Sequence, residues 1–378
     1  MKKYVAALLL PAVLLSGCAG LRPREADRLL VVQTVGWDTE GEAQTVSLSV
    51  PRDDARGGPV RLTGRGPTVL SALRDAQQIA PREELFYAHI RFAAVGEGAA
   101  RQGLQPLLDA MERSPQTRLD VPLLIVRGGE ARALVTGGDD ADSEITSLLD
   151  ALVREAEREG APRIATALET ARSLAEDGAS LCCAAELFYP GADAPSAEGA
   201  PAVRAAGSAV LKNGRLAGFL EPEAAAGAAL FTAGPLSLPL ALPTGDAEVT
   251  VRLLRCRVRT EALFDGEGRP LLRVRLTGRG ALAEQDGPAV DTAEIEARLS
   301  DALRSMAEAA LRSSRTLETD FLRLCRLWDG EALRRAGIDG AETLLRALVW
   351  EVDAEARLER PYDLRRAVPL RAGEGGAP

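Results

Sequence analysis

The residue whose type and position most clearly indicate chemistry is Cys18, because a thiol can be acylated. It follows Lys2, Lys3 and an apolar run at 4–15. A basic head, a short apolar segment and small residues before a cleavage point are typical of an export signal. The run of about 12 residues is too short for a membrane-spanning helix, which needs about 20. We therefore predict that the chain is exported.

The four residues Leu15-Ser16-Gly17-Cys18 resemble the bacterial lipobox. This resemblance implies that the Cys18 thiol receives a diacylglyceryl group and that cleavage removes residues 1–17 as a lipoprotein signal peptide. Acyl chains contribute about 0.8 kcal/mol for each buried CH₂ group, so two chains hold a protein stably on a bilayer. Residues 18–28 are then expected to be the lipid anchor and a charged tether.

The remaining cysteines, Cys182, Cys183, Cys256 and Cys325, each lie among apolar residues. The sequence has no CxxC pair and no Cys/His cluster, so no zinc site is expected. A buried free cysteine behaves as a small apolar residue. A disulfide in an exported protein, for example between Cys183 and Cys256, stays open, although no spacing supports it.

The single histidine, His89, lies in a stretch that predicts a strand at 85–95. As a catalytic base it would need a nucleophile and an orienting acid, and the sequence has no GxSxG elbow. We interpret His89 as structural. Gly96-Glu97-Gly98 follows the strand but lacks the third glycine of a dinucleotide loop, since position 101 is Arg, so it is interpreted as a tight turn.

The acidic residues form no catalytic or metal-binding pattern. Those within 139–144 lack the central glycine and the late glutamate of an EF-hand, and a solvated loop that caps the next helix is expected. Glu221 and Glu223 lie at a helix start, where the helix dipole favours carboxylates. We therefore predict no catalytic residue, no cofactor and no metal site.

Composition limits the classes of partner. The formal charge is −9, and loss of Lys2 and Lys3 leaves −11. An acidic chain is a poor match for nucleic acid, which needs a basic surface. Hydrophobic residues make up 46% of the sequence, which is enough for a sizeable core. About 360 residues remain after cleavage, and that length accommodates two or three domains.

The elements that must position these residues alternate between strands and helices. The first third predicts strands at 29–35, 45–51, 85–95 and 121–126, with helices at 67–79 and 98–111. A helical stretch at 145–175, broken at 160–162, and a strand at 183–188 follow. The stretch from 189 to 201, rich in Pro, Gly, Ala and Ser, is the strongest candidate for a domain boundary.

The second half begins with a hairpin around Asn213-Gly214, which is a strong turn signal. After it the sequence predicts a helix at 221–230, strands at 249–258 and 271–276, a long helix at 292–328, short helices at 331–335 and 342–348, and a strand at 349–358. The fold class is therefore α+β, a multi-domain arrangement of mixed sheets with packed helices. The expected parts are an N-terminal region at 29–190 that divides into two subdomains near 137–143, a linker at 191–206, a C-terminal domain at 207–370 and a disordered tail at 371–378.

A family resemblance is carried by several stretches in order along the mature chain. These are residues 30–38, 63–69, 85–91 with Gly96-Glu97, 207–220, 318–321 and Trp350. In order and spacing they resemble the Ger(x)C family, the C subunits of spore nutrient germinant receptors. The chain departs from the family in the Trp-Asp pair after the lipidated cysteine, which is replaced by Ala19-Gly20-Leu21-Arg22.

The resemblance implies a non-enzymatic subunit with three α+β domains. It further implies a chain held by lipidated Cys18 on the outer face of the spore inner membrane, packed on polytopic A and B subunits and needed for nutrient-triggered germination. Whether it binds a small nutrient stays open. Trp37, His89, Gly207 and Asp320 are expected to be packing and turn residues.

Two other functions stay open at this point. A lipid-anchored solute-binding protein would need a concave pocket with convergent polar groups, and the low aromatic content of 4% argues weakly against one. An extracytoplasmic hydrolase, for example one that acts on peptidoglycan, would need paired carboxylates. No such pair stands out in the sequence.

Overall fold

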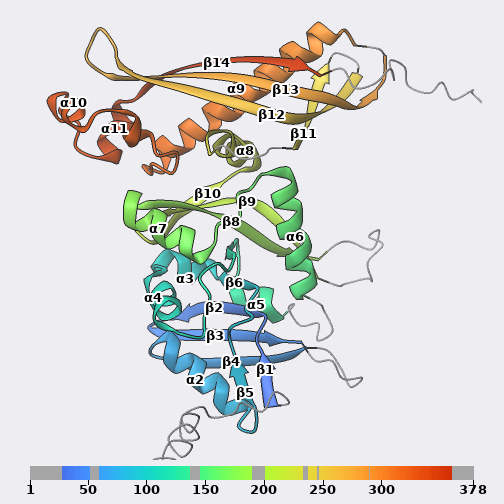
Figure 1. Ribbon diagram of the computed structural model, residues 1–378, viewed down its shortest axis with the longest axis vertical. Coiled ribbons are helices and arrows are strands. Elements are labelled where there is room, and N and C mark those ends of the chain that lie inside the picture. The colour runs from blue at the N-terminus through green and yellow to red at the C-terminus, as the bar shows by residue number, and fades with distance from the viewer. Residues whose placement is uncertain are drawn as a thin grey trace, which may run out of the picture.

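The computed structural model of the chain describes residues 28–51, 59–136, 145–189, 201–232, 237–244, 247–288 and 290–359. The described elements form an elongated molecule in which two sheets are stacked along the long axis, as Figure 1 shows. Cys18, the acidic stretch at 139–144 and the tail at 371–378 lie outside the described residues.

The larger sheet has eight strands in the order β10-β9-β8-β7-β6-β2-β3-β4. They are β2 (Thr34–Glu40), β3 (Ala43–Val50), β4 (Val60–Gly66), β6 (Phe92–Val95), β7 (Leu123–Val126), β8 (Ala179–Phe188), β9 (Ala202–Lys212) and β10 (Arg215–Leu220). Strands β2, β6, β7 and β8 run parallel, whereas the pairs at both ends of the sheet are antiparallel. A separate parallel pair joins β1 (Leu29–Val31) to β5 (Glu84–Phe86).

Helices cover both faces of the eight-stranded sheet. On one face lie α2 (Val69–Ile79), α3 (Glu97–Gln102), α4 (Gln105–Arg113) and α7 (Ala167–Asp177), and on the other lie α5 (Ala131–Thr136) and α6 (Ile145–Glu159). Strand β6 shows why both faces need cover: Ala93 and Val95 belong to one apolar cluster, and Phe92 and Ala94 to the other. A parallel strand buried on both sides is apolar throughout, as this one is.

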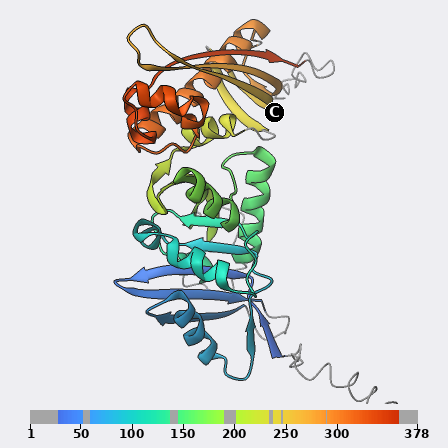
Figure 2. The same ribbon diagram turned by 60° about the vertical axis from the view of Figure 1, so that its left-hand side comes forward.

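The second sheet has the order β11-β12-β13-β14. Its strands are β11 (Leu238–Thr244), β12 (Ala247–Phe264), β13 (Pro270–Asp286) and β14 (Val349–Leu358). The long helix α9 (Thr292–Thr316) lies against one face, and Leu299 and Leu303 of α9 share an apolar cluster with Val251 and Leu253 of β12. Figure 2 shows the short helices η3 (Leu324–Leu327), α10 (Gly330–Arg335) and α11 (Ala341–Ala347) gathered at one end of this sheet.

Helix α8 (Pro222–Phe231) lies between the two sheets. We call residues 28–220 the N-terminal unit and residues 221–359 the C-terminal unit. Ala224, Ala225 and Ala228 of α8 share an apolar cluster with Val210 of β9 and Ala310 of α9. The helix therefore contributes to the contact between both units.

Strand pairing corrects the expected boundaries. The hairpin β9–β10 belongs to the eight-stranded sheet, because β9 pairs with β8 from Lys212 opposite Ala179 to Ala202 opposite Phe188. The expected linker at 191–206 and the C-terminal domain from 207 are therefore wrong at this end. The expected division near 137–143 separates no sheet either, since β7 and β8 are neighbours. A local hairpin signal does not indicate which sheet the hairpin will join.

The long helix and one strand also differ from their predicted bounds, and two strands had no prediction. The helix expected at 292–328 ends at Thr316, and the chain then turns through Glu318 and Arg323, which both have positive φ. The apolar spacing continues beyond the helix because Phe321 and Leu324 still face buried clusters. The strand expected at 85–95 is divided into β5 and β6 by a turn, and β4 and β11 had no prediction.

Candidate functional site

Trp37 and Asp38 lie in β2 and are both buried. The indole of Trp37 donates a hydrogen bond to Oε1 of Gln44 on β3 (2.9 Å). The two carboxylate oxygens of Asp38 accept hydrogen bonds from the backbone N–H groups of Ala131 and Arg132 (2.8 Å each) at the start of α5. Burial raises the pKa of Asp38, although these two N–H groups act in the opposite direction. The carboxylate thus fastens β2 to α5, and both its oxygens are occupied.

The Gly96-Glu97 turn packs directly against Asp38. A Cβ atom at Gly96 would overlap Oδ1 of Asp38, so only glycine fits. Burial acts to raise the pKa of Glu97, but hydrogen bonds from Gly128 N–H (2.7 Å) and Arg101 outweigh it and lower this pKa. Gly96 is the N-cap of α3. The chain does turn into a helix at Gly96, but the expected tight turn over 96–98 is wrong, because Glu97 and Gly98 are already the first residues of α3. Glu97 is a structural acceptor.

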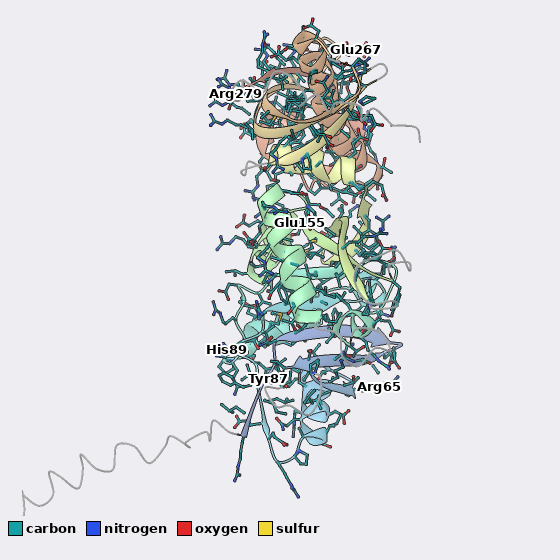
Figure 3. The ribbon with its side chains drawn as sticks, turned by 90° about the vertical axis from the view of Figure 1, so that its right-hand side faces the viewer. Arg65, Tyr87, His89, Glu155, Glu267 and Arg279 are labelled. Carbon is teal, nitrogen blue, oxygen red and sulfur yellow. The ribbon has the colours of Figure 1, made fainter. Side chains whose placement is uncertain are left out.

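His89 lies in the turn between β5 and β6 and is exposed. Figure 3 shows it beside Tyr87 on the surface of the N-terminal unit, and its ring centroid is 5.6 Å from that of Phe86. Burial raises the pKa of Tyr87 to about 12. Within the described ranges, no hydrogen bond joins His89 to a serine, cysteine or carboxylate. The expected strand at His89 is wrong, because a turn separates β5 from β6 there.

Gly207 lies where β9 crosses the end of β10. Its φ of +83° is in the left-handed region, and a Cβ atom there would overlap the carbonyl oxygen of Leu220. The turn of this hairpin has positive φ at Asn213 (50°) and Gly214 (79°), which matches the strand twist. Lys212 at the end of β9 pairs with Glu342 of α11 (2.6 Å). The hairpin therefore contacts the C-terminal unit directly.

Asp320 organises the turn that follows α9. It is buried, and its oxygens accept hydrogen bonds from the backbone N–H groups of Leu324 (2.7 Å) and Cys325 (2.8 Å). Burial raises the pKa of Asp320 despite these two donors. Trp37, Gly207 and Asp320 are thus packing and turn residues, as expected from the sequence.

The same turn carries two arginines that reach the other unit. Arg323 and Arg326 pair with Asp177 at the end of α7, at 3.1 and 2.6 Å. Arg326 also pairs with Glu176 (3.0 Å). Sequence reasoning gave no indication of this interface, because its partners are about 150 residues apart and carry no spacing signal.

The four described cysteines are free. Cys182 and Cys183 face opposite sides of β8 and belong to different clusters, while Cys256 and Cys325 contact the cluster under α9. Burial raises the pKa of Cys182 to about 11 and that of Cys183 to about 12. These thiols are protonated and unreactive at neutral pH. The bond considered between Cys183 and Cys256 is absent from this structure.

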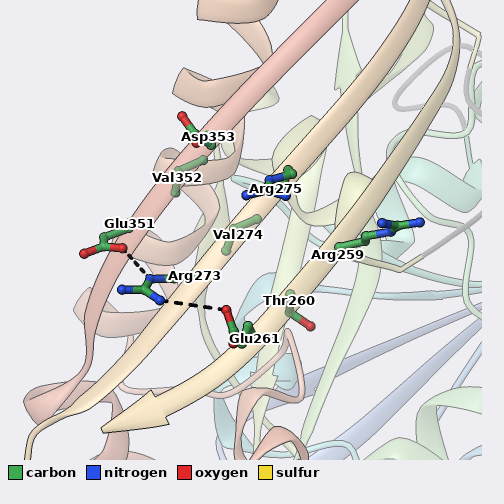
Figure 4. A pocket seen from close by; sticks show the side chains of 9 residues that line it. All are labelled: Arg259, Thr260, Glu261, Arg273, Val274, Arg275, Glu351, Val352 and Asp353. Carbon is green, nitrogen blue, oxygen red and sulfur yellow. Dashed lines mark hydrogen bonds and ion pairs between the residues drawn. The ribbon is translucent and has the colours of Figure 1, made fainter. Parts of the chain in front are cut away.

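Among the cavities of the described surface, three have linings that bear on function. One of about 470 Å³ lies on the face of β12–β14 that is opposite α9, and Figure 4 shows its charged lining. A second of about 220 Å³ lies between α7 and the turn at Phe321, and a third of about 330 Å³ lies beside Phe219 between α8 and α9. Small-molecule pockets are mostly apolar and enclosed. The largest of these three is instead an open, arginine-rich trough.

The described residues contain no group of three or more His, Cys, Asp or Glu side chains that could hold a metal ion. In the same part of the chain, no helix is long and apolar enough to cross a membrane. Asp38, Glu97 and Asp320 each use their oxygens on backbone or side-chain donors within the fold.

Comparison with known proteins agrees with this arrangement. A family model described as "Spore germination protein N-terminal domain" matches residues 22–184. YfkR of Bacillus subtilis (strain 168), whose name refers to spore germination, is 27% identical over 172 residues. That match spans 41% of this chain and 42% of YfkR, so less than half of either chain is compared.

The crystal structure of the GerBC protein has a similar fold, with a TM-score of 0.56 and 12% sequence identity. The likeness covers 86% of this chain and 97% of that one. It therefore extends over both units, including the second sheet, which the family model does not reach. Together these findings support the assignment of the chain to the Ger(x)C family of spore germination proteins, and the family model itself matches residues 22–184.

Proposed function

We propose that this chain is the lipid-anchored, non-enzymatic C subunit of a spore nutrient germinant receptor. Cys18 holds it on the outer face of the spore inner membrane, where it packs on the polytopic A and B subunits and stabilises their assembled state. The observation that carries the proposal is the family-domain match, which begins at residue 22, four positions after the lipobox cysteine.

The tether after Cys18 is short, which limits how far the N-terminal unit can lie from the membrane. Nine residues lie between Cys18 and Arg28, the first described residue, so the chain takes ten steps from one to the other. An extended chain spans at most about 3.3–3.6 Å per residue, so this end of the N-terminal unit stays within about 35 Å of the bilayer surface. Confinement of this kind raises the effective concentration of the chain near membrane partners without any new contact.

Replacement of Cys18 by alanine tests the anchor. Cys18→Ala removes the thiol that is acylated, so we expect no incorporation of labelled palmitate, loss of the protein from spore membranes and slower nutrient-triggered germination. The free energy of unfolding should not change, because Cys18 belongs to the expected tether that precedes the first strand. Leu21→Ala is the matched control in the tether and should behave as the wild type. Normal germination with a released, unlipidated chain would contradict the proposal.

The alternative of a solute-binding protein is tested by calorimetry on the full chain with amino acids, sugars and nucleosides. A scaffolding subunit predicts no heat of binding for any of them. Tight binding of one nutrient by the isolated chain would favour the alternative, and the cavity of about 220 Å³ between the two units would then be the place to substitute first.

A further inference from the structure

One face of the second sheet carries an unusual concentration of arginine. Strand alternation directs the side chains of Cys256, Val258, Val274 and Leu276 toward α9, where they contact its apolar cluster. The residues between them are exposed on the opposite face. Six exposed arginines on this opposite face form what we call the basic strip: Arg255, Arg257 and Arg259 of β12, with Arg273, Arg275 and Arg279 of β13.

Within the basic strip, positive charges lie directly opposite one another. The register places Arg259 against Arg275 and Arg255 against Arg279. Like charges in directly opposed positions destabilise a sheet. The arrangement stands out further because the whole chain has a formal charge of −9. The fold thus keeps a locally unfavourable arrangement that an anionic partner would relieve.

Most of these charges lack a counterion among the described residues. Arg273 pairs with Glu351 (2.7 Å) and Glu261 (3.9 Å), as the dashed lines in Figure 4 show, and Arg279 pairs with Glu359 (3.2 Å). By contrast, four of the arginines form no ion pair with another described residue: Arg255, Arg257, Arg259 and Arg275.

The basic strip lies beside a strand edge that no described strand covers. Strand β11 pairs with β12 only as far as Leu253, whereas β12 continues to Phe264. The backbone N–H of Asp265 donates to the carbonyl oxygen of Arg269 across the turn (2.9 Å). Antiparallel strands direct alternate residues to opposite sides, so the N–H and C=O groups of Val258 and Thr260 point away from β13, toward this edge.

An uncovered edge of this kind can receive an added strand, with main-chain hydrogen bonds supplying affinity and side chains supplying specificity. A segment added here would place alternate side chains on the same face as the arginines. Carboxylates suit those positions, because the guanidinium group donates hydrogen bonds to them in a planar fork. The trough of about 470 Å³ lined by Arg259, Arg273 and Arg275 lies over the same strands.

The width of the basic strip favours an extended protein segment over an anionic lipid surface. The neighbouring strand β14 presents an acidic row on the same face, with Glu351, Asp353 and Glu355 all exposed. Strands lie about 4.8 Å apart, so the positive region is only about 10 Å wide. A bilayer laid over this face would meet the acidic row as well, whereas a single extended chain would not.

We propose that the edge of β12 from residue 255 to residue 262 binds an extended, acidic segment of a partner protein as an additional strand, with its carboxylates paired to the basic strip. The proposal concerns this surface alone and stands whether or not the partner is a germinant receptor subunit.

Charge reversal tests the electrostatic half of the proposal. The probe is a fluorescent synthetic peptide of alternating Glu and Val, added to the full-length chain and followed by anisotropy. Arg257→Glu with Arg259→Glu should raise Kd at least about tenfold. The matched control, Arg74→Glu with Arg298→Glu, makes the same charge change on exposed helix positions of α2 and α9 and should leave Kd within about twofold. An equal loss in both variants would overturn the proposal.

Proline tests the strand-addition half. Thr260→Pro removes an edge-facing N–H but no bond to β13, so the sheet should persist, as checked by circular dichroism. Peptide binding should be lost in Thr260→Pro and kept in Thr260→Ala. Retention of binding in the folded Thr260→Pro variant would overturn strand addition. Binding to phosphatidylglycerol vesicles together with no binding to the peptide would also overturn the proposal, since it would identify a lipid surface.

Discussion

Two buried aspartates show how one side chain can stabilise the contact between two backbone segments. Asp38 and Asp320 each accept two backbone N–H groups, and burial raises the pKa of both. A raised pKa is often a mark of a catalytic acid. Here both oxygens of each carboxylate are occupied by the backbone, and neither residue lines any of the three cavities described above. Both carboxylates therefore act as hydrogen-bond acceptors for backbone N–H groups.

Removal of the Asp38 carboxylate should cost stability. Asp38→Ala leaves the N–H groups of Ala131 and Arg132 without acceptors in a buried place, and a buried unsatisfied donor costs about 1–3 kcal/mol. We expect a loss of that size in the free energy of unfolding, measured with urea. Asp301→Ala on the exposed side of α9 is the control and should change it by less than about 0.5 kcal/mol. Equal effects of the two substitutions would contradict this role.

The raised pKa of Asp38 also predicts a dependence on pH. The folded protein holds this proton more tightly than the unfolded chain, whose pKa is about 3.8. Asp38 therefore adds stability that is fully present below the unfolded pKa and is lost as pH rises through the folded pKa. Asp38→Asn cannot titrate. The difference in free energy of unfolding between wild type and Asp38→Asn should fall as pH rises from about 3.5 and then become constant. A difference that grows with pH would show that the pKa is lowered.

At the scale of elements, helix α9 connects most parts of the C-terminal unit. Arg315 in its last turn stacks on Trp350 of β14, with 4.0 Å from the guanidinium carbon to the ring centroid. The same guanidinium donates hydrogen bonds to the carbonyl oxygens of Leu345 and Leu348. One side chain thus joins α9, α11 and β14. On its other side α9 contacts α8 closely, because Gly227 lies against the backbone of Met306.

Gly227→Ala should separate α8 from α9. The new Cβ atom would overlap the carbonyl oxygen of Met306, and forcing extra atoms into a close contact costs about 1–3 kcal/mol. Gly98→Ala in α3 is the control, because nothing lies within 4 Å of its Cβ position. That change should stabilise the protein by about 0.4–1 kcal/mol. Urea unfolding of both variants measures the contrast, and stabilisation by both would mean that the two helices do not pack this closely.

At the scale of the molecule, apolar contacts and ion pairs both join the two units. The apolar contact includes Leu181 and Leu220 from the eight-stranded sheet and Phe321 from the turn after α9. The ion pairs join Arg323 and Arg326 to Asp177, and both arginine side chains are nearly half exposed. Water and salt reach the arginines and screen these pairs, although the Asp177 side chain itself is only 11% exposed. The apolar cluster should therefore dominate the contact.

Phe321→Ala tests whether the apolar cluster contributes more than the ion pairs to the contact between the units. Loss of a buried phenylalanine costs about 3–5 kcal/mol, and the two units should then unfold in separate steps. Tryptophan fluorescence can follow them, since Trp37 lies in the N-terminal unit while Trp328 and Trp350 lie in the C-terminal unit. Arg326→Ala should leave a single transition nearly unchanged. Uncoupling by Arg326→Ala instead would give the ion pairs the larger role.

Local patterns in the sequence determined much of this protein. The α+β class, the lipobox and the family resemblance follow from residues close together in the chain. The closing strand at 349–358 has the bounds of β14, and the short helix expected at 221–230 is α8 with its bounds shifted by one residue. These elements carry their own signals, such as strand alternation, a helix-start proline or an Asn-Gly turn, and need no distant partner to be recognised.

Only the tertiary structure decided which distant segments meet. It placed the β9–β10 hairpin in the larger sheet, ended α9 at Thr316, brought Arg326 to Asp177 and left β12 beyond Leu253 without a described strand on its outer side. Apolar spacing is the same whether a residue faces the core from a helix or from a turn, and strand alternation does not specify a neighbouring strand. Such choices depend on burial and hydrogen bonding between segments far apart in sequence, which no local pattern encodes.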